Sequence, residues 1–156
     1  MVLEGRNIWD LIVRRAEASP DKEMLVDEAG TRVTFADYRD RSERVAAGLA
    51  AEGVAADDIV SWVLPTWVES LVLVGALRRL GAVSNPILPI YREREVGFCA
   101  KQAGAKLLIT PSEFGGFDYA AMATQIAAGL DGVEVLVVDK EGLPQGDPST
   151  LPPPPS

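Results

Sequence analysis

The chain has 156 residues, of which 47% are hydrophobic and 24% charged, which is the length and composition of one globular domain with its own core. Its 15 Lys and Arg residues against 23 Asp and Glu residues give a net charge of −8, which argues against a nucleic-acid or anionic-membrane surface as the main partner. The absence of histidine and the single cysteine, Cys99, exclude Ser–His–Asp and Cys–His catalysis, zinc clusters and an internal disulfide.

The N-terminal stretch MVLEGRNIWDLIV carries Glu4, Arg6 and Asp10 among its apolar residues, which is unlike a signal peptide. No apolar run of the sequence approaches the roughly 18–20 residues that a membrane-spanning helix needs. We therefore expect a cytoplasmic protein without a membrane span.

A small helix and a β-hairpin are predicted first along the chain. Residues 7–18 carry apolar side chains at helical spacing, and Pro20 ends this pattern. The stretch EMLVDEAGTRVTF then has two short apolar runs around Gly30, which is typical of a hairpin.

Two Thr-x-x-acid patterns predict the starts of the next helices. Thr34 with Asp37 has the spacing of a capping box, and the helix behind it has an apolar face. Thr66 with Glu69 has the same spacing before a helix that extends to about Leu80 and is apolar nearly all round. Such a helix is usually buried on more than one side.

From residue 58 onward, short apolar strands alternate with helices. The strands are continuous apolar runs, which indicates burial on both faces of the sheet. This pattern predicts an α/β fold, with a doubly wound, mostly parallel sheet and flanking helices. The predicted strands are 58–64, 82–87, 106–110 and 133–138, and the predicted helices between the last three are 92–104 and 118–130.

The C-terminal stretch LPQGDPSTLPPPPS contains six prolines and has no apolar periodicity. We therefore divide the chain into an α/β unit at 1–143 and a Pro-rich linker or disordered tail at 144–156. A linker in this position indicates that the chain is one piece of a longer protein.

The stretch AVSNPILPIYREREV is the first candidate site, because ligands of parallel sheets bind beyond the carboxyl ends of the strands. Tyr91 offers an aromatic face with a hydroxyl, and Arg92 could meet an anion. The alternative is a structural corner in which Glu93 and Glu95 stabilise the first turn of the next helix. Both alternatives remain open from these residues.

Other polar residues carry weaker signals. Asp57 and Asp58 stand before a strand, which places them at the opposite end of the sheet, in a solvated turn. The sequence contains neither Gly-x-Gly-x-x-Gly nor Gly-x-x-x-x-Gly-Lys-[Ser/Thr], so no loop is predicted to hold a triphosphate. We predict no catalytic, cofactor-binding or metal-ligating residue in this chain.

Four short motifs follow one another in a fixed order: Thr34-Phe35, Leu64-Pro65 before Glu69, Gly81-Ala82 and Pro89-x-Tyr91-x-x-Arg94-Glu95-Val96. Their combination resembles the N-terminal part of the adenylate-forming enzymes, which include acyl-CoA synthetases, nonribosomal-peptide adenylation domains and luciferases. ILPIYREREVGF is most similar to synthetases for short, medium or alicyclic carboxylic acids. Leu88 and Thr66 depart from the family pattern, since many members have Asn at both positions.

The resemblance implies a parent ligase, active in fatty acid metabolism, that uses ATP, Mg and coenzyme A to turn a carboxylic acid into an acyl adenylate and then an acyl-CoA. It implies that Tyr91 and Arg92 lie near the acyl or CoA channel. The family's phosphate-binding loop, magnesium-serving acid and catalytic lysine are absent here, so the chain alone is expected to be inactive and to need the rest of the ligase as its partner.

Two other interpretations stay open, and so does the oligomeric state. One is a noncatalytic binding or interaction module of doubly wound form. The other is a flavodoxin-like or receiver domain, although a receiver needs a carboxylate cluster beyond the strand ends that this sequence does not show. A reading frame that continues into the Gly-rich phosphate loop would favour the ligase.

Overall fold

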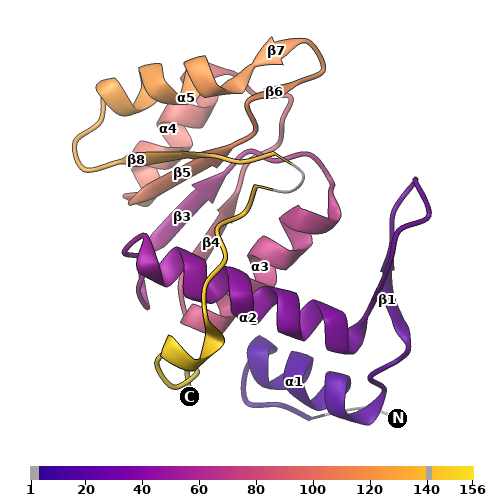
Figure 1. Cartoon of the computed structure of the whole chain (residues 1–156). Helices are drawn as coiled ribbons and strands as arrows, with labels where there is room; N and C mark the ends of the chain where they lie inside the picture. The colour runs from indigo at the N-terminus through magenta and orange to yellow at the C-terminus, as the bar shows by residue number, and fades with distance from the viewer. Residues whose placement is uncertain (1–3, 140–141) are drawn as a thin grey trace.

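The computed structural model describes residues 4–139 and 142–156 and places a helix and a hairpin beside a sheet that carries helices on both faces (Figure 1). This arrangement confirms the predicted α/β fold. The helices are α1 Ile8–Ala18, α2 Phe35–Ala51, α3 Val68–Leu80, α4 Glu93–Ala103, α5 Tyr119–Ala128 and the 3₁₀ turn η1 Pro148–Thr150. The strands are β1 Glu23–Val26, β2 Arg32–Thr34, β3 Ile59–Trp62, β4 Val83–Pro86, β5 Leu107–Thr110, β6 Glu113–Phe114, β7 Phe117–Asp118 and β8 Glu134–Val137.

The central sheet has four parallel strands in the order β4-β3-β5-β8. The chain therefore moves from β3 to one side through α3 and returns across β3 through α4. All four residues of β5 are buried, as expected for an inner strand that is covered on both faces. The predicted doubly wound sheet is confirmed.

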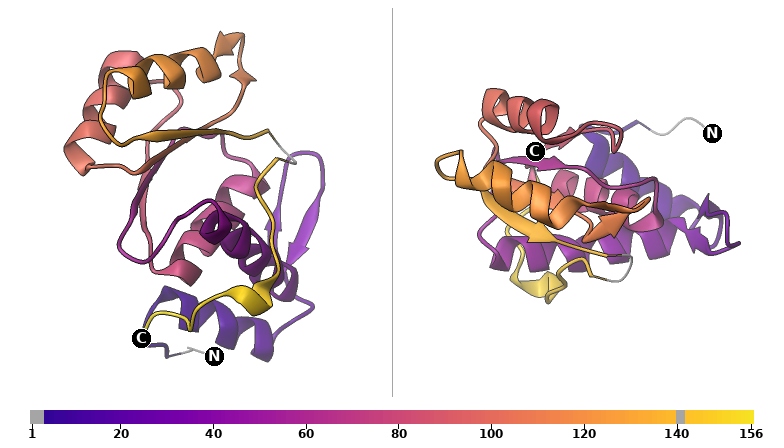
Figure 2. Two further views of the ribbon diagram at one scale, coloured as in Figure 1. Left: turned by 60° about the vertical axis from the view of Figure 1, so that its left-hand side comes forward. Right: turned by 90° about the horizontal axis from the view of Figure 1, so that it is seen from above.

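Helices cover both faces of this sheet, α2 and α3 on one and α4 and α5 on the other (Figure 2). A separate apolar cluster lies under each pair of helices. Neighbouring residues of β5 point to opposite faces, so Ile109 packs with α2 and α3, whereas Leu108 packs with α4 and α5. Both side chains are fully buried. The sheet thus separates two distinct helical layers.

Of the two predicted capping boxes, the first is formed in the structure and the second is not. Thr34 Oγ1 accepts the N–H of Asp37 at 3.1 Å, and the Asp37 carboxylate accepts the N–H of Thr34 at 3.3 Å, which confirms the first box. The second is wrong, because the N-cap of α3 is Trp67 and no side chain caps it. The Pro65 carbonyl accepts the Trp67 N–H at 2.8 Å, and this turn makes the helix begin one residue later than Thr66 would require.

The described part of the C-terminal segment, residues 142–156, crosses α2 and ends beside α1 (Figure 1). The Arg79 guanidinium donates to the Pro152 carbonyl at 2.9 Å, and the Asn7 side chain donates to the Pro155 carbonyl at 2.9 Å. Leu143 is buried in the α2–α3 cluster. The stretch predicted as a linker or disordered tail is therefore fastened to the domain by contacts with residues far away in the sequence. We call residues 142–156 the strap.

Within the described ranges, no helix combines the length and the apolar character that would let it cross a membrane.

Candidate functional site

The corner between β4 and α4 lies at the carboxyl edge of the sheet, where parallel sheets bind their ligands. Ile87 is buried, and its N–H donates to the Trp62 carbonyl at 2.9 Å, which extends the pairing of β4 with β3. The next residues face outward: Leu88 is 60% exposed, Ile90 74% and Tyr91 40%. The chain thus presents an apolar, aromatic surface as soon as it leaves the sheet.

A small hairpin that the sequence analysis did not predict supports this corner. Its strands β6 and β7 are joined by Gly115 and Gly116, whose φ angles of 60° and 76° are left-handed and suit a two-residue hairpin turn. The turn leads directly into α5 and places Phe117 and Tyr119 edge to face, with ring centroids 4.9 Å apart. The sequence signal was the glycine pair between Phe114 and Phe117.

Arg92 holds the corner against these two rings. Its guanidinium carbon lies 4.2 Å from the centroid of Phe117, and its Nη1 donates to the Pro89 carbonyl at 2.9 Å and to the Tyr91 carbonyl at 3.0 Å. The Tyr119 hydroxyl donates to the same Pro89 carbonyl at 2.6 Å. These contacts fix the backbone from Pro89 to Arg92.

Tyr91 is not packed into the core as a simple bend would require. Its ring lies at the rim of an open hollow of about 920 Å³ between α4 and α5. The apolar part of this hollow comes from Phe98, Cys99, Ile126 and Leu130. The phenol therefore has both an apolar surface beside it and free access to solvent.

Two further contacts tie the loops at this edge together. Trp67, at the start of α3, meets Phe114 of the hairpin edge to face at 6.1 Å. Ser112, after β5, donates its hydroxyl to the Asp139 carboxylate after β8 at 2.8 Å. The carboxyl edge is thus a connected rim, and the hairpin touches the loops that follow both β3 and β4.

The acidic pair Asp57-Asp58 lies at the opposite, amino edge of the sheet, where it was predicted. The Lys106 ammonium lies 2.8 Å from the Asp58 carboxylate, and this hydrogen bond, followed by one from the N–H of Ala55, holds the pKa of Asp58 below its usual value. These contacts tie the turn that precedes β3 to the residue that precedes β5.

Chemically, the rim can bind apolar or aromatic groups and can offer the Tyr91 hydroxyl for a hydrogen bond. In residues 4–139 and 142–156 there is no group of three or more Cys, Asp or Glu side chains that could hold a metal ion. Neither a phosphate loop nor a general base is evident at the described part of this rim.

Comparison with known proteins identifies the family. The chain matches the family described as AMP-binding enzyme over residues 12–155. It is 33% identical to triostin synthetase I of Streptomyces triostinicus over 156 residues, which cover 93% of this chain and 29% of that protein. It is also 33% identical to the medium-chain fatty-acid–CoA ligase of Escherichia coli K12 over 108 residues, or 69% of this chain and 19% of the ligase.

Among solved structures, the fold is similar to that of o-succinylbenzoate coenzyme A synthetase of Bacillus subtilis in complex with AMP. The TM-score is 0.71 with 25% sequence identity, over 88% of this chain and 32% of that one. The chain thus spans less than a third of the length of each of these proteins. The match over residues 12–155 shows that this chain belongs to the AMP-binding enzyme family of adenylate-forming ligases.

Proposed function

We propose that this chain is the N-terminal portion of an ATP-dependent acyl-CoA synthetase. In that reaction a carboxylate attacks the α-phosphorus of ATP and releases pyrophosphate, and the thiol of coenzyme A then displaces AMP to form the thioester. The observation that carries the proposal is the family match over residues 12–155, with an E. coli fatty-acid–CoA ligase among the relatives.

Within this enzyme, we propose that residues 1–143 form one α/β subdomain and that 144–156 link it to the rest of the ligase. The Bacillus synthetase was solved with AMP, and an enzyme of this reaction needs ATP and Mg. The residues described here do not fit ATP–Mg, since they offer no glycine-rich loop with a lysine and no carboxylate cluster. We therefore assign no chemical step to this chain.

Its role is instead to shape a wall of the acyl or CoA channel. Tyr91 is the proposed contact, because its ring is 40% exposed beside an open hollow while its backbone is fixed. Arg92 is proposed as the positioning residue, since its guanidinium is already engaged by two carbonyls and the Phe117 ring. Binding of an anion at Arg92 stays a prediction.

Pyrophosphate release tests the ligase proposal. The 156-residue chain, supplied with carboxylic acids, coenzyme A and Mg-ATP, is expected to give no turnover above a protein-free control. The product of the complete reading frame is expected to release pyrophosphate in an acid-dependent manner. Turnover that copurifies with the short chain, or none from the complete product with any acid, would count against the proposal.

The alternative is an adenylate-forming ligase whose acyl acceptor is not coenzyme A, because the names of the relatives do not all include coenzyme A and that of triostin synthetase I does not. In the same assay, a product that forms acyl adenylate but never consumes coenzyme A would identify that alternative.

The role of Tyr91 is tested in the complete enzyme by comparing Tyr91→Phe with Tyr91→Ala. If the ring lines the channel, Tyr91→Ala raises the KM for the acid or for coenzyme A, whereas Tyr91→Phe changes it little unless the hydroxyl itself is used. If Tyr91 only shapes the bend, Tyr91→Ala lowers the melting temperature and leaves the kinetic constants of the folded enzyme unchanged.

A further inference from the structure

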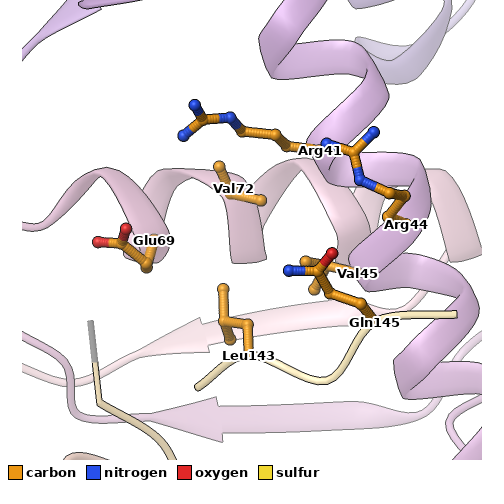
Figure 3. Close-up of a pocket in the computed structure, with 7 residues that line it drawn as sticks. All are labelled: Arg41, Arg44, Val45, Glu69, Val72, Leu143 and Gln145. Carbon is orange, nitrogen blue, oxygen red and sulfur yellow. The ribbon is translucent and has the colours of Figure 1, made fainter. Parts of the chain in front are cut away.

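We propose that the cavity between α2, α3 and the strap binds a small phosphate monoester that also carries a hydrogen-bond donor. The cavity has a volume of about 310 Å³. It lies on the α2–α3 side of the sheet, away from the α4–α5 hollow at Tyr91. Its lining residues are Arg41, Arg44, Val45, Glu69, Val72, Leu143 and Gln145 (Figure 3).

Two guanidinium groups stand on one side of this cavity. Arg41 and Arg44 are three residues apart on α2, so their side chains are neighbours on the helix surface. Neither has a hydrogen bond or an ion pair to any residue of the described ranges. Like charges at this spacing repel each other, and an anion placed between them would relieve that repulsion.

The acids that could neutralise these arginines from α2 itself are already engaged. Asp37 accepts hydrogen bonds from Thr34 as part of the helix cap. Asp40 pairs with Arg39 at 2.7 Å, and Glu43 faces Arg79 at 3.6 Å. Both arginines also attract the Asp37 carboxylate over a longer distance and help to lower its pKa. In a chain of net charge −8, two adjacent arginines without a hydrogen bond or ion pair in the described ranges are an unusual surface, and both line the cavity.

Across the cavity, α3 presents Glu69, and Figure 3 shows its carboxylate on the side opposite Arg44. Although their charges are opposite, no ion pair within 4.0 Å joins Glu69 to either arginine in the described structure. A ligand that places an anionic group at the arginines and a hydroxyl or ammonium group at Glu69 would satisfy both sides. The floor between them is apolar, formed by Val45, Val72 and Leu143.

The strap builds the remaining wall. The Gly146 N–H donates to the Arg44 carbonyl at 2.9 Å, which brings Gln145 beside the Arg44 side chain (Figure 3). This close approach needs Gly48, where an added Cβ would stand 2.4 Å from the backbone of Pro144. The cavity therefore exists only while the strap lies against α2.

Size and charge together select the ligand class. A volume of about 310 Å³ is at the lower end for small-molecule sites, so it suits a compact metabolite and is too small for a whole dinucleotide or coenzyme A. Two separate guanidinium groups match the three terminal oxygens of a phosphate monoester better than the two oxygens of one carboxylate.

O-Phosphoethanolamine, which has a phosphate and an ammonium, is a suitable probe for the 156-residue chain, with titration followed by calorimetry and by the NMR signals of the arginine Nε–H groups. We expect saturable binding. Arg41→Gln/Arg44→Gln should weaken it by at least about tenfold, as expected for the loss of charge-assisted hydrogen bonds. The matched control Arg78→Gln/Arg94→Gln removes the same charge elsewhere and should leave the affinity within about twofold.

Two further probes and two variants separate the parts of the site. Ethyl phosphate lacks the ammonium, so Glu69→Gln should weaken O-phosphoethanolamine but not ethyl phosphate. β-Alanine keeps the ammonium but replaces the phosphate by a carboxylate, and it should bind more weakly. Gln145→Ala should weaken the phosphates without lowering the melting temperature, which shows that the strap contributes to the site.

The proposal is overturned if no phosphate probe binds saturably to the folded chain. Equal losses in the two double-arginine variants would also overturn it, because binding would then reflect net charge alone. Preferential binding of β-alanine would replace the phosphate by a carboxylate ligand and refute the class proposed here. These outcomes do not depend on whether the ligase proposal is correct.

Discussion

On one face of the sheet, α2, α3 and the strap bury a continuous cluster in which Leu49, Leu73 and Leu77 are fully shielded from solvent. On the other face, α4 and α5 cover the strands but leave an open hollow between them, and Phe98 is 63% exposed at its rim. Both layers are helical and apolar, so the difference lies in what covers the outer side of the helices.

The strap accounts for much of this difference. It lies over α2 and contributes Leu143 to the cluster, whereas no described segment lies across the α4–α5 hollow. A contiguous exposed apolar surface commonly marks a contact surface. The closed face therefore supplies most of the buried core, whereas the open face, with Tyr91 at its rim, offers an exposed apolar surface for recognition.

The largest expected contrast comes from truncating one apolar side chain on each face. Leu73→Ala should lower the free energy of unfolding by about 3 kcal/mol, because Leu73 is fully buried and its loss leaves a cavity. Phe98→Ala should change it by less than about 0.5 kcal/mol, since most of that ring is already in water. Urea denaturation measures both values. Equal losses would show that the two faces are equally well packed.

The second contrast concerns the strap and uses adjacent arginines of α3. Arg79 is 7% exposed and donates to the Pro152 carbonyl, so Arg79→Ala should cost about 2 kcal/mol and make the strap cleavable by proteases. The control Arg78→Ala removes an exposed neighbour and should leave both properties unchanged. Stability lost without any gain in cleavage of the strap would contradict the anchoring role of Arg79.

The sequence predicts the helices that cover both faces of the sheet, but it does not predict the strap that closes one of them. Apolar periodicity is local, and it correctly predicted the helices and the strands of the parallel sheet in order, but not the β6–β7 hairpin. Residues 144–156 were expected as a linker or disordered tail from their proline content, but contacts such as that of Arg79 with Pro152 join residues 73 positions apart. A proline-rich composition carries no signal for such long-range contacts.

The sequence predicted where the candidate site lies, but not which of its two residues, Tyr91 or Arg92, has a side chain that other residues already engage. The corner was expected at the carboxyl edge of the sheet, and Tyr91 lies there with an exposed ring. Arg92 was the second candidate, as a possible anion contact, yet its guanidinium faces Phe117 and Tyr119. Phe117 lies in the β6–β7 hairpin, which the sequence analysis did not predict, and Tyr119 begins the helix after it. Which of two adjacent polar side chains is free depends on these distant rings.

The third contrast separates the two threonines that were expected to cap helices. Thr34 makes the capping hydrogen bonds of α2, so Thr34→Ala should lower the free energy of unfolding by about 1 kcal/mol. Thr66 is exposed and caps nothing, so Thr66→Ala should stay within about 0.5 kcal/mol of the parent. Equal effects in urea denaturation would contradict the start of α3 described here.

The smallest expected effect is a pH dependence at the amino edge of the sheet, away from both helical faces. The pKa of Asp58 is lowered in the folded protein, chiefly by its hydrogen bond with Lys106. A carboxyl group whose folded pKa is depressed contributes stability above its unfolded pKa, of about 4, and loses it as the pH falls through the folded pKa. Asp58→Asn should therefore cost about 0.5 kcal/mol at pH 7, a value typical of a partly exposed pair, and the gap between variant and parent should close at acid pH.

Urea midpoints measured from pH 7 down to about pH 3 test this expectation. Asp57→Asn is the matched control, because Asp57 has a left-handed backbone with φ 65° that Asn tolerates, and its side chain makes no ion pair in the described structure. The control should run parallel to the parent at every pH. A gap for Asp58→Asn that persists unchanged into acid would show that its cost does not come from the charge that faces Lys106.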